Sequence, residues 1–167
     1  MNKDLTNSAI DRQNILNNPY AIAEIEKAAG VRGIPFEGKT VLLKEQVAAF
    51  FEVTLRTVEN YLEQNAKELA LNGYEVLKGK RLKDLKLSIQ ALDVPETDFG
   101  NIIKTPQLAI FDFRAFLNLA MLVSESERAK LLRLYFSACK FHCFQDGNKR
   151  IAITSRLEIL IKICSRK

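Results

Sequence analysis

The chain has 167 residues, of which 47% are apolar and 27% are charged, and this composition is typical of a globular protein rather than a disordered one. Its length is sufficient for one compact domain or two small ones. The formal charge of +5 permits a nucleic-acid or nucleotide partner, although charge alone identifies none.

Two observations indicate where the protein resides. No apolar run approaches the ~20 residues that a membrane span needs, and residues 1–14 are polar, without the apolar core of a signal peptide. We therefore expect a cytoplasmic protein with no membrane partner. A disulfide framework is not expected, because Cys139, Cys143 and Cys164 are an odd number in a chain without a secretion signal.

Most of the expected elements are helical. Residues 17–30 have a proline near the start and a glycine at the end, which favours a short helix. Residues 41–71 have helical periodicity with a break in the middle. Residues 73–83 are predicted to form two short strands around Lys78 and Gly79.

Proline and glycine between residues 84 and 107 indicate a boundary, after which the chain is predicted to be helical again from Ala109. Within this later part, Ser124 and Glu127 have the spacing of a capping box, so we expect a helix to begin there.

A two-helix pattern lies within residues 44–64, where two apolar stripes flank a turn at 52–54. The small side chain of Ala48 would let the helices cross closely, as in a helix-turn-helix, whose second helix enters the major groove. Glu52 stands where many such turns use glycine. The side facing the groove would show Thr54, Leu55, Arg56, Glu59 and Asn60. Of these, arginine can read guanine edges and asparagine can read adenine edges.

The basic stretch that follows resembles the wing of a winged helix. Its cations would lie at backbone phosphates, which position a protein without reading sequence. They are Lys78, Lys80, Arg81 and Lys83. The alternative is an αα-hairpin followed by a solvated basic loop.

Residues 12–133 resemble the N-terminal part of RhuM-like proteins from bacterial virulence islands and mobile elements. The matching stretches are KEQVAAFFEVTLRTVENYL, NGYEVLKGKRL and AIFDFRAFLNLAMLVSESERAKLLR. We expect a mainly α protein with an N-terminal helix-turn-helix, a small β-hairpin wing and a C-terminal helical segment. The expected regions are a winged helix-turn-helix-like region, a linker and the helical segment, at residues 1–90, 91–107 and 108–167.

The stretch FHCFQDGNKRIAI, residues 141–153, contains the only histidine of the chain. It fits the pattern H-x-F-x-D-G-N-[GK]-R and resembles the signature of the Fic/Doc family, whose enzymes mostly transfer AMP from ATP to a hydroxyl group on a target protein. The matching residues are His142, Phe144, Asp146, Gly147, Asn148 and Arg150.

These residue types suit phosphate chemistry. An imidazole with an ordinary pKa of about 6.5 suits His142 as the base that takes the proton from the attacking hydroxyl. Asp146 can hold a magnesium ion that bridges phosphates, and Arg150 can donate two hydrogen bonds to a phosphate in the transition state. We predict His142, Asp146, Asn148 and Arg150 as catalytic residues. The predicted nucleotide-binding residues, which include a close-approach glycine and a helix start, are Gly147, Asn148, Lys149 and Arg150.

Two alternatives remain for this stretch. It could be an ordinary turn and helix cap that contains a structural histidine. It could also be a zinc site, although the ligand spacing is poor; its ligands would be Cys139, His142, Cys143 and Cys164.

A complete Fic core also has a β-hairpin flap that holds the target segment, and the only hairpin predicted here is the basic one near residue 79. We therefore expect a Fic-like nucleotidyl transferase with an N-terminal DNA-binding unit, which a second copy or a partner would complete. The alternative is a RhuM-like regulatory DNA-binding protein that carries an incomplete, inactive Fic remnant. ATP, Mg²⁺ and a target protein with a hydroxyl side chain are implied by the family resemblance.

Overall fold

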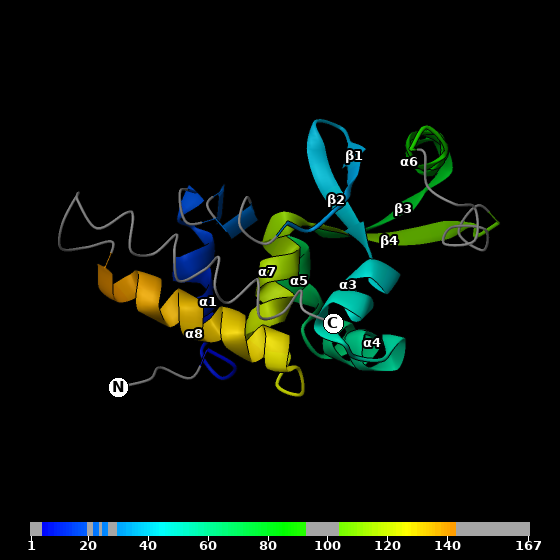
Figure 1. The fold of residues 1–167 in the computed structure, drawn as a ribbon. Coiled ribbons are helices and arrows are strands. Elements are labelled where there is room, and N and C mark those ends of the chain that lie inside the picture. The colour runs from blue at the N-terminus through cyan, green and yellow to red at the C-terminus, as the bar shows by residue number, and fades with distance from the viewer. Residues whose placement is uncertain (1–4, 20–21, 24, 27–29, 93–103, 143–167) are drawn as a thin grey trace.

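The structure, a computed structural model, describes residues 5–19, 22–23, 25–26, 30–92 and 104–142 (Figure 1). The strands are β1 (Ile34–Phe36), β2 (Lys39–Leu43), β3 (Tyr74–Lys78) and β4 (Gln107–Asp112). The helices are α1 (Ala9–Leu16), α3 (Lys44–Phe51), α4 (Leu55–Gln64), α5 (Ala66–Leu71), α6 (Gly79–Gln90), α7 (Phe113–Leu122) and α8 (Glu127–His142). The described part is thus mainly helical, as expected, with a larger sheet than expected. The prediction of helix from Ala109 was wrong for its first residues, which belong to strand β4, and the helix begins at Phe113.

The four strands form one antiparallel sheet in the order β1-β2-β4-β3. Strand β4 lies at its centre, with Phe111 opposite Leu42 on β2 and Ile110 opposite Glu75 on β3. The turn between β1 and β2 has positive φ at Glu37 and Gly38, which suits a two-residue hairpin connection. Because β4 follows the predicted linker, both sides of that linker share one sheet.

The two faces of the sheet are covered by different helices (Figure 1). Side chains alternate along a strand, so Leu42 and Phe111 point into a large core shared with α3, α5 and α7. Their neighbours Leu43 and Ile110 point into a smaller core on the other face. Helix α6 closes that smaller core with leucine and isoleucine side chains at helical spacing, Leu82, Leu85 and Ile89.

Phenylalanine rings join α3 to α7 inside the large core. The rings of Phe51 and Phe116 stack at 5.1 Å, and Phe50 meets Phe116 edge-on at 5.0 Å. Phe113 adds a second stacked contact to Phe116, at 5.5 Å. Phe51 and Phe116 are almost completely buried, so the position of α3 depends on this aromatic cluster.

The predicted hairpin around Lys78 and Gly79 was wrong. Its first half is strand β3, but the chain enters helix α6 at Gly79, which has a φ of +60°. The reason is periodicity, because the apolar residues after Gly79 recur at three- and four-residue intervals and favour a helix. The partner of β3 is β4, more than 25 residues later.

The predicted capping box at Ser124 was also wrong by two residues. Helix α8 begins at Glu127, and the hydroxyl of Ser126 accepts a hydrogen bond from the backbone N–H of Ala129. Ser126 is buried, so this serine caps the helix where it packs against the core.

Replacing Phe116 by alanine should lower the free energy of unfolding by about 3–5 kcal/mol, because it removes the central ring of the aromatic cluster. Chemical denaturation followed by circular dichroism measures this change. The control is Leu71→Ala, since Leu71 is 82% exposed and its loss should change stability by no more than about 0.5 kcal/mol. Equal effects of the two variants would contradict this description of the core.

Candidate nucleic-acid interface

Helices α3 and α4 are joined by a short turn. The sequence did not predict the backbone conformation of this turn. Glu52 ends α3 in the left-handed conformation, with φ 55° and ψ 40°, and the N–H of Val53 donates to the carbonyl of Ala48 at 3.1 Å. Glutamate therefore adopts the conformation for which glycine is favoured. Thr54 then caps α4, because its hydroxyl accepts a hydrogen bond from the N–H of Thr57.

The two sides of α4 differ in burial as the sequence predicted. Val58 is fully buried against the large core, as is Ala48 on α3 at 4% exposure, and Leu62 continues the buried stripe. The opposite side is open, with Leu55 41% exposed. The predicted reading residues Thr54, Arg56 and Asn60 are all exposed on this side.

An ion pair crosses between the two helices on the open side. The ammonium nitrogen of Lys44, at the start of α3, lies 2.6 Å from Oε1 of Glu59 on α4. This hydrogen bond lowers the pKa of Glu59, so its carboxylate is charged at neutral pH.

Side chains from the α7–α8 connection and from the start of α8 contact both helices, and the sequence did not predict these contacts. The hydroxyl of Tyr61 on α4 donates to the carboxylate of Glu125 at 2.7 Å, and this bond lowers the pKa of Glu125. Arg128 reaches α3, where it donates to the carbonyl of Phe50 at 3.0 Å and pairs with Glu52 at 3.0 Å. Residues more than 60 positions later in the chain thus hold the two helices on either side of the turn.

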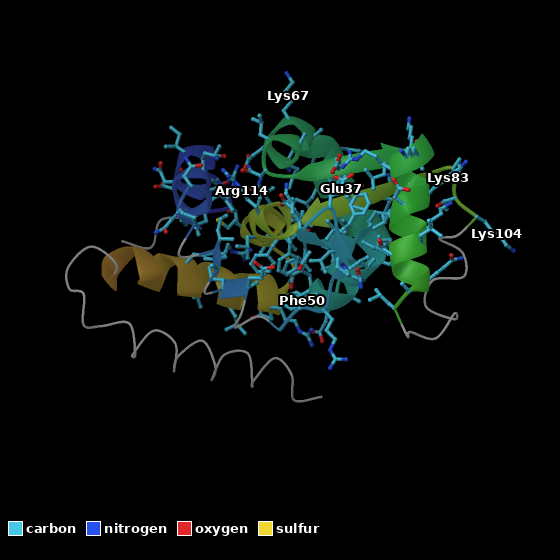
Figure 2. All side chains as sticks on the ribbon, turned by 90° about the horizontal axis from the view of Figure 1, so that it is seen from above. Glu37, Phe50, Lys67, Lys83, Lys104 and Arg114 are labelled. Carbon is cyan, nitrogen blue, oxygen red and sulfur yellow. The ribbon has the colours of Figure 1, made fainter. Side chains whose placement is uncertain are left out.

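The basic residues near position 80 lie on and beside α6. Lys78, Lys80 and Lys83 are exposed, and Lys104, before β4, projects at the same side of the molecule as Lys83 (Figure 2). Lys80 and Lys83 lie on α6 and Lys78 is the last residue of β3, so these lysines do not form the β-hairpin wing that was predicted.

Arg81 differs from its basic neighbours. Its guanidinium makes two hydrogen bonds to Glu37, of 2.8 and 2.6 Å, and a 2.7 Å bond to Glu75. It also lies over the ring of Phe36, 5.8 Å from the ring centre. Arg81 therefore joins α6 to the β1–β2 hairpin and to β3. Its guanidinium group, which was predicted to contact phosphate, already has these two carboxylate partners.

The predicted nucleotide site lies almost entirely outside the described residues. His142 is the last described residue of α8. The remaining predicted residues, Asp146, Gly147, Asn148, Lys149 and Arg150, fall outside the described ranges, as do Cys143 and Cys164 of the zinc alternative.

Among the described residues, no cluster of three or more histidine, cysteine, aspartate and glutamate side chains could hold a metal ion. No helix in the same part of the chain has the length and apolar character needed to cross a membrane. No protein-family model, curated protein or solved structure matches this chain.

The left-handed turn can be tested at Glu52. Glu52→Gly and Glu52→Ala both remove the ion pair with Arg128, so their difference isolates the backbone. The alanine variant should be less stable than the glycine variant by about 1 kcal/mol, because a Cβ is disfavoured at positive φ. Thermal melting of the two proteins measures this difference, and an alanine variant at least as stable as the glycine variant would refute the turn geometry.

Proposed function

We propose that the described part of this chain binds double-stranded DNA, with α4 in the major groove. The supporting observation is the division of α4 into a buried side, with Val58 and Leu62, and an open side that offers Arg56 and Asn60. Both side chains can make paired hydrogen bonds to base edges. The two-helix unit is held by the sheet and by the α7–α8 connection, which gives a reading helix a fixed position.

The segment that contains α3 and α4 and the segment that contains the start of α6 differ in charge. Residues 44–64 contain two cations and four acids, so α3 and α4 do not themselves attract a polyanion. Residues 78–86 contain five cations and one acid. Helices α4 and α6 both lie on the right of Figure 1 with the sheet between them, because α6 covers one face of the sheet and α4 belongs to the core on the other face. In this proposal α6 contacts phosphates and supplies affinity, while α4 supplies specificity.

Strands β3 and β4 take the place of the wing. They are the antiparallel pair that follows the two helices, and residues 79–106, including α6, lie between them. The phosphate-contacting residues of the proposal are Lys78, Lys80, Lys83 and Lys104, and Arg81 serves to hold α6 in place.

The experiment on specificity begins with selection of a preferred site from a random duplex library. Arg56→Ala should weaken binding to that site by roughly 5- to 150-fold, which corresponds to the loss of about 1–3 kcal/mol from a base contact. Fluorescence anisotropy with labelled duplex measures this loss. Lys67→Ala is the control, because Lys67 is an exposed cation on α5 that projects away from Lys83 and Lys104 (Figure 2). Failure of the wild type to bind any duplex would refute the proposal.

The experiment on affinity uses the double variant Lys80→Ala, Lys83→Ala. It should weaken binding to all duplexes alike. It should also reduce the magnitude of the slope of the log association constant against log salt concentration by about 2, since each lysine that contacts a phosphate releases about one counterion. Titrations at a series of salt concentrations give the slope. A slope equal to that of the wild type would show that α6 does not contact the phosphates.

A second candidate function concerns the C-terminal segment, which we propose transfers AMP from ATP to a protein hydroxyl. It is supported by the H-x-F-x-D-G-N-x-R spacing from His142 to Arg150. Calorimetry with ATP and Mg²⁺ should show saturable binding in the wild type and none in Arg150→Ala. No binding at millimolar ATP would exclude an assembled site in this chain alone.

A further inference from the structure

We propose that Glu59 determines specificity in this interface by accepting a hydrogen bond from the N4 amino group of a cytosine, and that Lys44 positions its carboxylate. This inference rests on the proposed DNA-binding function and adds a base that the site recognises. It assigns a purpose to the one acidic side chain that lies among the reading residues.

Glu59 belongs to the reading side of α4. It follows Arg56 by three residues and precedes Asn60, so it shares the exposed side with Arg56. Its side chain is 38% exposed. A helix that places Arg56 and Asn60 at base edges therefore brings the carboxylate of Glu59 to the same groove.

Lys44 fixes one oxygen of this carboxylate. Its ammonium nitrogen lies 2.6 Å from Oε1, and its own side chain is only 25% exposed. Oε2 makes no hydrogen bond to any residue within the described ranges. The pair thus presents one oriented acceptor, and the lysine charge offsets the repulsion that a carboxylate would meet between two phosphate strands.

The chemistry of the groove selects cytosine. A carboxylate only accepts hydrogen bonds, and the amino groups that donate in the major groove are N4 of cytosine and N6 of adenine. Beside N6, adenine presents the acceptor N7, which repels a second carboxylate oxygen, whereas cytosine presents no such acceptor. An ion pair kept for stability alone is a weaker account, since exposed pairs contribute little to folding.

The test compares base preferences among variants of the full chain. The probe is a random-sequence duplex library, selected in parallel with wild type, Glu59→Gln, Lys44→Met and Glu63→Gln, and sequenced. Glu63→Gln is the charge control, because it removes the same charge from the exposed residue one turn after Glu59 on the same side of α4. Thermal melting confirms that all four proteins are folded.

We expect the wild type to prefer C·G by about tenfold at one position. Glu59→Gln should lose this preference and gain one for A·T there, because an amide can pair with N6 and N7 of adenine. Lys44→Met should weaken the cytosine preference at that position only, and Glu63→Gln should leave every position unchanged.

Two results would overturn the inference while leaving the proposed function intact. In the first, Glu59→Gln keeps the preferences of the wild type while Arg56→Ala changes them. In the second, Glu59→Gln binds all duplexes more tightly with unchanged preferences, which would mean that Glu59 only repels phosphate. A wild type that binds no duplex would overturn both the inference and the proposed function.

Discussion

The pairing of β4 between β2 and β3 is the constraint on which the rest of the described structure depends. Two strands that flank the α3–α5 segment are joined through a third that enters from much later in the chain. The alternation of Ile110 and Phe111 then assigns one core to each face of the sheet. Helix α7 follows β4 directly, with Asp112 as its cap, so the same strand also delivers the Phe113 and Phe116 rings that hold α3.

Sequence periodicity anticipated the local features of this fold and missed those that depend on distant partners. The two apolar stripes within residues 44–64 predicted the buried sides of α3 and α4, because helical periodicity is a local property. The hairpin prediction at Gly79 failed because the partner of β3 lies beyond α6, and pairing at that separation leaves no local signal. The ties from Glu125 and Arg128 to α4 and α3 could not be predicted for the same reason, since opposite charges in a sequence do not reveal which of them meet. The division into residues 1–90, 91–107 and 108–167 stays a prediction, with the sheet spanning both of its boundaries.

The distribution of charge explains why a helix with few cations is still a reasonable reading element. Salt-dependent attraction to phosphate and recognition of base edges are separate contributions, and the proposed function assigns them to α6 and α4 respectively. Arg81 links this division to the fold, since its bonds to Glu37 and Glu75 fix α6 on the sheet. The same separation leaves room on α4 for an acid such as Glu59, which would be unfavourable if that helix alone had to attract DNA.

The most direct test of this account is amide chemical-shift mapping of the full ¹⁵N-labelled chain during titration with a duplex selected by the wild type. We expect the largest changes at Thr54–Asn60 on α4 and at Lys80–Lys83 on α6, with α1 and α5 little affected. Changes concentrated on α1 and α5, with α4 and α6 unperturbed, would contradict the account, because they would place the nucleic acid away from both proposed contact helices.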